Sequence, residues 1–583
     1  MFLNILHRPT PAHYPFFQMQ QDWAHALGLK VSVMATYPSM QDPRIVADLN
    51  EYAAKHGDEL GIYFTEIDCP AFREKTGLHM DAVWLYAADE KRRIFDLVLS
   101  EFRKCFGRDP VSVAGYHLDS VSLTLLRELC PSIEIAVAGC FEEGVRVFHG
   151  CNNSWYLFNE GMPWNPWYPS RDNALRPAVS EEEALGIVAV PHLSRDMVLS
   201  YEGRNDFWAS HPGNAMRGLG YKDGQCPYTF NLVDQYLAQE EHNDGFSYYN
   251  VFVGPGWLNH NMNIDDPPEV AQRLHREQYE YFAELRSQGR LTDMTLSEFA
   301  TWYRRHRPIG QSEVYLASDI LYGSRKQYLW HLDPDMRVLL DMAQGGSIGD
   351  LRPYIARLSG FTGSDSPSLQ IGSYPYLIHS QHRTGVANHA FDGARTTLEV
   401  AHGDEVLDLC SCRTRVAQLE HDEDGCVVRL TPTRLSFQDG LTASIETSCR
   451  FARRGRIFIS RRLVEVSSPH VSLGLREYVK ACYGYTEYPE DMRGIVLAVS
   501  GEDEQELTYD YRSRTICADG ATSVAAVIPQ INTELRLSSL DGPADSGRAL
   551  EGHLFSPFFT LVMEKELGAG ESMQTCLSVS KVP

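Results

Sequence analysis

The chain has no long hydrophobic run and no excess of positive charge. Its apolar stretches fall short of the roughly 18–20 residues that a transmembrane helix requires. The net charge of −24, from 77 acidic and 53 basic residues, disfavours nucleic acid or an anionic membrane as a partner, because like charges repel. Walker, HExxH and strand-linked Gly-x-Gly-x-x-Gly motifs are missing as well. We therefore expect no nucleic-acid partner, no membrane partner and no cofactor.

The cysteines form no disulfide framework or zinc motif. There are 13 of them at irregular spacing, and Cys410 and Cys412 are the only close pair, without the second pair that a zinc knuckle needs. Residues 1–9 lack the basic start of a secretory signal, and Asn4 and His7 interrupt their apolar run. These features predict reduced thiols and a cytoplasmic protein.

The first half of the chain alternates strand-like and helix-like segments. A length of 583 residues exceeds what one hydrophobic core supports, so at least two domains are expected. Because helical segments separate most of the strands, the pattern predicts parallel strands with right-handed crossovers, in an α/β irregular (β/α)7 barrel. The seven predicted strands are 2–6, 29–36, 59–68, 111–116, 133–141, 186–193 and 246–253.

The second half has a different pattern. A basic run at 304–307, stopped by Pro308, predicts a boundary between a catalytic domain at 1–307 and a second domain at 308–583. Residues 347–362 predict a short helical lead-in. From residue 370 onward, alternating strands separated by Asp-Gly or Gly turns predict a large all-β sandwich domain.

The stretch 111–120 organises the candidate site. It is a short apolar strand that runs into His117, Leu118 and Asp119, just before a helical segment at 121–130. In α/β barrels, chemistry takes place at the carboxyl ends of the strands. Asp119 is therefore the first catalytic candidate. The alternative is that Asp119 only caps the helix that follows.

Three segments resemble the polysaccharide deacetylase superfamily and related glycoside hydrolases: KHGDELGIYF at 55–64, GLKVSVMAT at 28–36 and LTDMTLSEF at 291–299. The resemblance covers about residues 1–305 and, in architecture only, the rest. It implies an irregular seven-stranded barrel followed by a mutarotase-like β-sandwich, and an activity on carbohydrates. It also implies a catalytic aspartate after the fourth strand, where Asp119 stands.

The chain departs from that family at the metal ligands. Deacetylases of this kind place an aspartate after strand one and a His-x-x-x-His pair after strand three. Here His7 and Arg8 follow strand one, and residues 63–68 contain no histidine. The His-x-Asp motif of the α-mannosidase type is not matched either. We therefore expect no catalytic metal.

Glycosidic hydrolysis requires one protonated acid and one ionised carboxylate. Asp119 is the expected nucleophile or base, and Glu66 or Asp68 the expected acid. If the third strand continues through 59–68, alternation places Glu66 and Asp68 on the same side, and their mutual repulsion raises one pKa. The alternative is a solvated pair on a loop. His192 is a further catalytic candidate, or else a structural histidine.

The remaining candidates are expected to bind substrate. Arg8 suits an anionic sugar because guanidinium pairs with oxyanions, or else it forms a salt bridge that holds neighbouring acids. Aromatic rings in the loops stack on sugar faces, or else pack a loop core. The expected substrate-binding residues are His7, Arg8, His117, Glu142, Trp164, Trp167, Tyr168, Asp196 and Trp257.

Together these features predict a glycoside hydrolase that cleaves a glycoside or oligosaccharide with paired carboxylates at the barrel mouth. One alternative is a metal-dependent carbohydrate deacetylase with a displaced site at His117, His192 or Asp196. Another is a sugar-binding protein without catalysis. The expected partner is a carbohydrate, and homo-oligomerisation is left open.

Overall fold

The computed structural model describes residues 1–115, 118–139, 161–202, 225–259, 268–360, 374–381, 393–422, 425–485 and 488–582. Backbone contacts divide the chain into two units. Unit 1 comprises Met1–Gln311, Asp319–Gly323 and Ser359–Tyr374, and unit 2 comprises Ser312–Ser318, Ser324–Leu358 and Pro375–Pro583. The first change of unit thus falls close to Pro308.

Unit 1 is a parallel barrel. Within its described residues, the strands pair in the order β6-β5-β4-β3-β2-β1-β7, and β8 pairs with β1. Each of these pairings is parallel, as the alternation of strands and helices predicts. The strands are β1 (Phe2–His7), β2 (Ser32–Thr36), β3 (Glu59–Tyr63), β4 (Ser112–Ala114), β5 (Ile135–Gly139), β6 (Val188–Pro191), β7 (Tyr248–Phe252) and β8 (Thr292–Asp293).

Asn250 bridges the gap between the two end strands of the barrel, β6 and β7. Its side-chain amide donates to the carbonyl oxygens of Pro191, at 2.7 Å, and His192, at 3.2 Å. Ser194 N–H donates to Asn250 O at 2.9 Å, and Asn250 N–H donates to Ser194 Oγ at 2.9 Å. These bonds satisfy edge groups that a strand ladder would otherwise satisfy, and they fix the chain after β6 beside β7.

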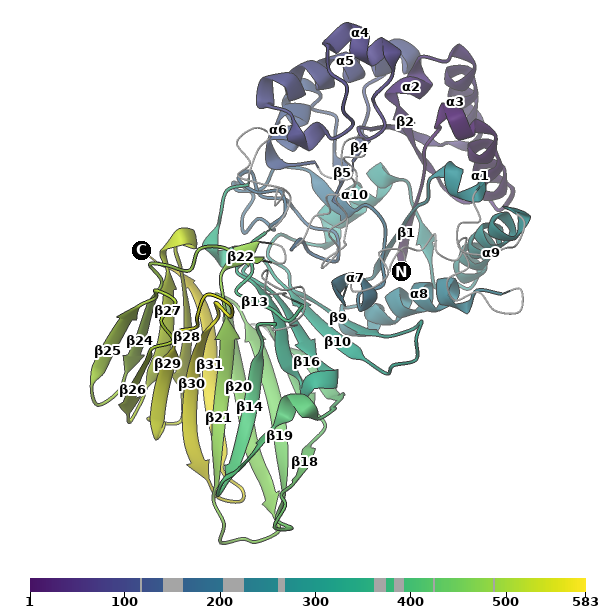
Figure 1. Ribbon diagram of the computed structural model, residues 1–583. Helices are drawn as coiled ribbons and strands as arrows, with labels where there is room; N and C mark the ends of the chain where they lie inside the picture. Colours follow the sequence, from purple (N-terminus) through teal and green to yellow (C-terminus); the bar gives the residue numbers. More distant parts are fainter. Residues whose placement is uncertain are drawn as a thin grey trace. The chain divides into compact units, whose positions relative to one another are not determined.

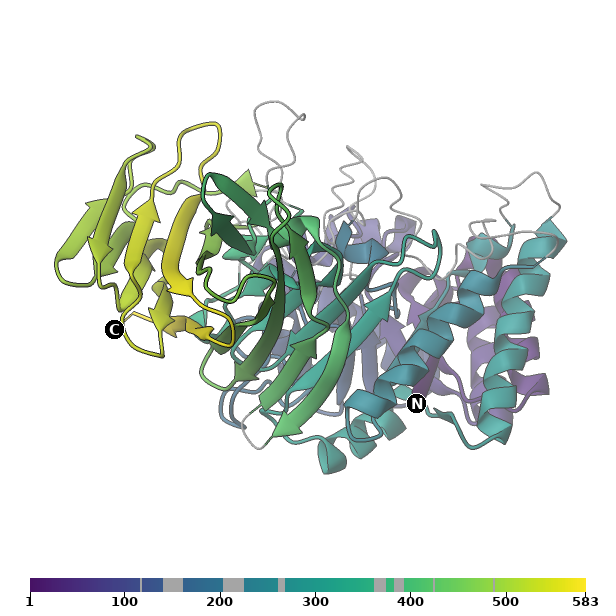
Figure 2. The same ribbon diagram turned by 90° about the horizontal axis from the view of Figure 1, so that it is seen from below.

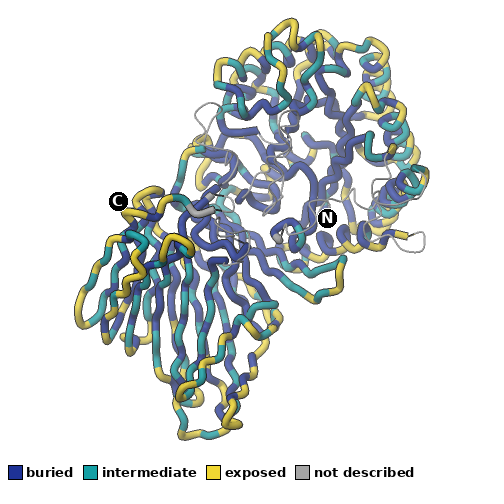
Figure 3. Tube along the Cα trace, viewed as in Figure 1, coloured by how far each residue is buried: buried dark blue, intermediate teal, exposed yellow. Residues whose placement is uncertain are grey.

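The helices of unit 1 surround the strands, and their outward turns are exposed while the strands are buried (Figures 1 and 3). In α3, Asp42 caps the first turn by accepting from Arg44 N–H at 2.9 Å, and Gly57 ends the helix with φ 78°, as the sequence signals predict. Helices α1 and α9 pack side by side (Figure 2). The helices are α1 (Tyr14–Ala26), α2 (Tyr37–Met40), α3 (Pro43–His56), α4 (Pro70–Thr76), α5 (Ala88–Phe106), α6 (Ser120–Leu129), α7 (Leu199–Glu202), α8 (Pro227–Leu237), α9 (Pro268–Ser287) and α10 (Leu296–His306).

Unit 2 is antiparallel and all-β. In its described part, the main sheets have the orders β15-β14-β21-β30-β29-β26 and β16-β17-β19-β20-β31-β28-β27-β24-β25, with β18 paired to β19. Strand β21 alternates between buried and partly exposed residues along its whole length, and β19 does so up to Phe451. One apolar core contains their buried apolar side chains. This is the pattern of a β-sandwich. A further sheet has the order β13-β12-β11-β10-β9.

The strands of unit 2 have the following bounds: β9 (Glu313–Ser318), β10 (Gln327–Leu332), β11 (Arg337–Asp341), β12 (Ser347–Arg352), β13 (Ile378–His379), β14 (Thr396–His402), β15 (Glu405–Asp408), β16 (Val416–Asp422), β17 (Gly425–Leu430), β18 (Thr433–Ser436), β19 (Thr442–Ala452), β20 (Arg456–Val466), β21 (Leu473–Ala481), β22 (Gly484–Tyr485), β23 (Tyr488–Pro489), β24 (Val496–Ser500), β25 (Glu504–Thr508), β26 (Thr515–Asp519), β27 (Ser523–Ile528), β28 (Thr533–Ser539), β29 (Ser546–Leu550), β30 (Phe559–Leu567) and β31 (Ser572–Lys581).

Two details of the predicted elements are wrong. The expected helical lead-in at 347–362 begins instead with strand β12, which is buried throughout and pairs with β11. The helix expected in this range is confirmed only as a short 3-10 helix at Tyr354–Ala356. A strand buried on both faces has no period-2 pattern, so its sequence does not distinguish it from a buried helix. The third barrel strand does not reach residue 68. It ends at Tyr63.

No helix in the described ranges is both long enough and apolar enough to cross a bilayer.

Candidate functional site

The carboxyl ends of β1 and β3 bring Arg8 and Glu66 together. Arg8 Nη2 lies 3.1 Å from Glu66 Oε1, and Thr10 Oγ1 donates to Glu66 Oε2 at 3.0 Å. Arg8 Nη1 donates to the Tyr63 hydroxyl at 2.9 Å. The Arg8 residue is only 8% exposed, whereas the Glu66 side chain is 31% exposed. A buried cation therefore holds a solvent-facing carboxylate at the barrel mouth.

Glu66 adopts an unusual backbone conformation. Its φ is 63°, in the left-handed region that residues other than glycine occupy infrequently. The strand has ended at Tyr63, so Glu66 lies in a turn and not in a continuing strand. Its bonds to Arg8 and Thr10 help to stabilise this turn. Strained turns of this kind are concentrated at functional sites.

Aromatic rings and a histidine line the mouth beside Arg8. The Arg8 guanidinium carbon lies 5.2 Å from the centre of the Tyr63 ring and 5.8 Å from that of Phe252, within the range of cation–π attraction. The His192 ring centre lies 4.7 Å from that of Phe252. Burial, together with the positive charges of Arg8 and Arg195, holds the pKa of His192 well below its ordinary value. The imidazole is therefore neutral at physiological pH.

Gly254, after β7, leaves the space that the Arg8 side chain occupies. A Cβ at residue 254 would lie 2.3 Å from Arg8 Nη2. Gly254→Ala is therefore expected to displace the guanidinium from Glu66, with a loss of about 1–3 kcal/mol in unfolding free energy from overpacking and a fall in any turnover at this site. Thermal unfolding and turnover assays check both effects. Gly360→Ala is the control, because its added Cβ would meet other atoms only at ordinary distances of 3.5 Å. Unchanged turnover in Gly254→Ala would contradict the prediction.

Asp68 does not share the mouth with Glu66. It forms a bidentate pair with Arg73 of α4, with both N–O distances 2.7 Å. Asp81 lies beside it and accepts the Asp68 N–H at 2.7 Å. Burial, and then the negative charges of Asp68 and Glu66, raise the pKa of Asp81. Repulsion between carboxylates was expected to raise the pKa of Glu66 or Asp68. In the structure it contributes to the raised pKa of Asp81.

Asp119 caps α6 and pairs with a buried lysine. Its Oδ1 accepts the Ser122 N–H at 2.8 Å, and its Oδ2 lies 2.6 Å from Lys91 Nζ of α5. Asp119 is 4% exposed and Lys91 is fully buried. This is the geometry of the helix-capping alternative, with an ion pair added. A catalytic role of Asp119 remains a prediction.

Asp196 is buried at the start of α7. Its Oδ1 accepts the N–H groups of Val198, at 2.9 Å, and Leu199, at 3.0 Å. Burial raises the pKa of Asp196 to about 7, and the charge of Asp319 acts in the same direction, while the bonds from the two N–H groups oppose the shift. At 0% exposure, this carboxyl group makes no contact with solvent in this structure.

His7 faces the helices and not the mouth, contrary to its expected place on the rim. Its Nδ1 is bonded to Gln21 of α1 at 2.9 Å, and its Nε2 to Tyr279 of α9 at 2.6 Å. Burial lowers its pKa to about 4. Successive residues of a strand point to opposite faces, so Arg8 and His7 cannot both serve the same cavity.

The expected platform of aromatic rings is not formed. Trp164 and Trp167 are only 1% and 4% exposed, and the Trp167 indole N–H donates to Ala174 O at 2.9 Å. Tyr168 packs on Tyr303 and donates to Arg307 O at 2.8 Å. A ring that stacks on a sugar must present a free face, so these side chains pack the loop. Trp257, after β7, is partly exposed.

His117 and Glu142 lie outside the described residues. Among the side chains that the structure does describe, no three of His, Cys, Asp or Glu gather as metal ligands do. The structure thus unites Arg8, Glu66 and His192 of the predicted residues. His7, Asp68 and Asp119 are bonded to other groups.

The sequence did not identify Thr10, Tyr63, Asp81, Lys91 or Gly254 as parts of this region. Thr10 follows the first predicted strand, so its position was a usable signal, whereas Tyr63 lies inside the predicted third strand at 59–68. Lys91 belongs to a helix turn rich in charge, where exposure is the ordinary expectation. Nothing local marks Asp81 or Gly254, because their roles depend on contacts with distant residues.

Residues 31–317 match a family model described as a domain of unknown function with solved structure (DUF3863). No curated protein matches the sequence. The matched range covers the barrel from β2 onward and ends in β9.

Solved structures show distant likenesses. A protein from Parabacteroides distasonis, provisionally described as a glycoside hydrolase/deacetylase, is 14% identical, with 64% of this chain and 88% of that chain covered and a TM-score of 0.46. A 4-alpha-glucanotransferase from Thermococcus litoralis is 10% identical, with 100% and 99% covered and a TM-score of 0.31. A galactose mutarotase-like protein from Clostridium acetobutylicum is 8% identical, with 46% and 99% covered and a TM-score of 0.32. At these values the likenesses assign no activity to this chain.

Proposed function

We propose that the chain is a carbohydrate-active enzyme that cleaves glycosidic bonds at the mouth of the barrel. The observation that carries the proposal is the ion pair between Arg8 and Glu66 at the carboxyl ends of the strands. Enzymes built on α/β barrels place their reacting groups at this edge. Glu66 has solvent access and a fixed orientation, and both are required of a group that meets a substrate.

Glu66 is the proposed ionised carboxylate, acting as nucleophile or as base toward water. Arg8 provides its counterion at 3.1 Å, and Thr10 donates a hydrogen bond to its other oxygen. These two contacts set the direction of the carboxylate. In this arrangement Arg8 positions Glu66, and the Tyr63 hydroxyl in turn accepts a hydrogen bond from Arg8 at 2.9 Å.

Asp81 is the proposed acid. Burial and the neighbouring charges of Asp68 and Glu66 raise its pKa, which keeps a carboxyl group protonated closer to neutral pH. Carboxyl groups in environments that push their pKa values apart are the usual arrangement for acid and base roles. Trp257 is partly exposed after β7 and is the proposed ring for stacking on a sugar.

The test compares wild type and Asp81→Asn on glycosides with good and poor leaving groups. Wild type is expected to cleave at least one dinitrophenyl glycoside and one oligosaccharide. Asp81→Asn is expected to lose about 100-fold or more on the oligosaccharide and little on the dinitrophenyl glycoside, because dinitrophenolate leaves without a proton.

Arg73→Gln is a matched control, because it removes the partner of Asp68 on the exposed side of the same loop and leaves Asp81 in place. Equal losses of Asp81→Asn on both substrates would contradict the acid role. Release of acetate from acetylated sugars without glycosidic cleavage would contradict the proposed reaction.

A further inference from the structure

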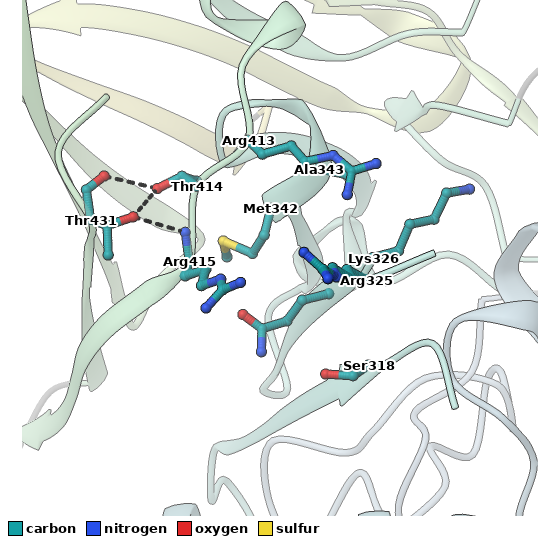
Figure 4. Close-up of a pocket in the computed structure, with 10 residues that line it drawn as sticks. Ser318, Arg325, Lys326, Met342, Ala343, Arg413, Thr414, Arg415 and Thr431 are labelled. Carbon is teal, nitrogen blue, oxygen red and sulfur yellow. Dashed lines mark hydrogen bonds between the residues drawn. The ribbon is translucent and has the colours of Figure 1, made fainter. Parts of the chain in front are cut away.

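Unit 2 holds a pocket of about 430 Å³ that is lined by none of the residues of the barrel mouth. Ends of β9, β10 and β11 form one side of it, and the segment before β16 forms the other (Figure 4). We call it the basic pocket and define it by Arg325, Lys326, Gln327, Arg413, Thr414 and Arg415. Its volume falls within the roughly 300–1,000 Å³ of small-molecule sites.

The lining of the basic pocket is strongly positive. Arg325, Lys326, Arg413 and Arg415 line it, and no Asp or Glu is among the described residues that do. No described carboxylate lies in ion-pair range of Arg325, Arg413 or Arg415. In a chain with net charge −24, such a grouping concentrates positive potential at one place, and this attracts anions.

The pocket has a fixed frame behind its cations. Thr414 Oγ1 is bonded to Thr431 O at 2.9 Å, and Arg415 N–H donates to Thr431 Oγ1 at 3.1 Å. Arg413 Nη1 donates to Ser324 O at 3.0 Å, which links this segment to the residues that precede β10. Figure 4 shows the guanidinium groups of Arg325 and Arg415 on facing sides of the pocket. Arginine pairs with oxyanions in bidentate fashion.

Gln327 places a second requirement on the ligand of the basic pocket, which is a hydrogen-bond donor. Its side-chain oxygen is buried and accepts no hydrogen bond within the described part of the chain. A buried acceptor is costly unless a donor reaches it. A hydroxyl group supplies such a donor, whereas a bare inorganic anion does not.

We propose that the basic pocket binds an acidic saccharide. Arg325 and Arg415 hold its oxyanion, and a sugar hydroxyl donates to Gln327. Carboxylate, sulfate and phosphate share the oxyanion chemistry, so the probes must separate them. The proposal does not depend on the reaction at the barrel mouth, because it concerns binding alone.

The test is calorimetric titration of the full chain with oligogalacturonate, a sulfated oligosaccharide and a sugar phosphate, each beside its neutral counterpart. At least one acidic probe is expected to bind, and its neutral counterpart to bind far more weakly. The double variant Arg325→Gln/Arg415→Gln is expected to weaken that binding on the order of 100-fold or more, because it removes two charged hydrogen-bond donors to the oxyanion. The acidic probe that binds most tightly identifies the oxyanion.

The charge-matched control is Arg434→Gln, an exposed arginine of β18 that does not line the pocket. It is expected to retain wild-type affinity. Arg325, Arg413 and Arg415 are exposed, so their variants are expected to fold, and rising salt should weaken wild-type binding in parallel. Equal affinity for acidic and neutral probes, or equal affinity of the double variant and wild type, would overturn the proposal.

Discussion

Glu66→Gln is expected to lower turnover about 100- to 10,000-fold on every glycoside that the wild type cleaves. Glutamine keeps the shape of the side chain and its bond to Thr10 but removes the charge, so it can neither attack the sugar nor accept a proton from water. The loss should be the same for good and poor leaving groups. This distinguishes Glu66 from the proposed acid, Asp81. Steady-state kinetics on a dinitrophenyl glycoside and on an oligosaccharide measure it.

Glu74→Gln is the matched control for Glu66→Gln. Glu74 is an exposed glutamate of α4 and is not part of the ion pair between Arg8 and Glu66. Its neutral variant should retain turnover within about threefold, because surface substitutions of this kind change stability by only about 0.5 kcal/mol. Full activity in Glu66→Gln would remove Glu66 from the mechanism. A large loss in Asp119→Asn at unchanged stability would restore Asp119 as the reacting carboxylate.

Asp119→Asn is expected to destabilise unit 1 by about 3–5 kcal/mol. The variant leaves the Lys91 ammonium fully buried without a counterion, and breaking one side of a buried ion pair has a cost of this size. Asparagine still caps a helix well, so the loss comes from the unpaired charge and not from the lost cap. Urea unfolding of wild type and variant measures the difference.

Two further variants test the cause. Lys91→Met/Asp119→Asn removes both charges and should be more stable than Asp119→Asn alone, since a buried pair replaced by neutral groups has little net cost. Lys104→Met, on the same helix, removes a lysine whose side chain is 75% exposed and pairs with Glu101, and it should change stability by less than about 1 kcal/mol. If Asp119→Asn were as mild as Lys104→Met, the ion pair would not stabilise the unit.

The fold of the barrel was largely predictable, because its signals are local. Asp42 before α3 and Gly57 after it mark that helix in the sequence as clearly as in the structure. The apolar runs between such caps predicted parallel strands. The prediction of element type and bounds failed where the pattern of neighbouring residues carries no information. In β12 both faces are buried. Strand β3 ends at Tyr63 and not at residue 68, and Glu66 lies in a turn with positive φ.

The site was predictable only in part. Polar residues at strand ends were found, and Arg8, Glu66 and His192 do lie together. The sequence could not distinguish the inner face of β1 from the outer face at its last residues, so His7 and Arg8 were both expected at the mouth. It also could not show that Trp167 donates its indole N–H to a loop carbonyl, which makes that ring part of the packing.

The sequence by itself determined the order of strands and helices, the change from barrel to sandwich and the excess of acid, since periodicity, turn residues and composition are properties of neighbouring residues. Only the tertiary structure decided which carboxylate meets which cation. Glu66 pairs with Arg8 and Asp119 with Lys91. These partners lie on separate elements of the barrel, and only the closure of the sheet and the packing of its helices bring their charges within bonding distance.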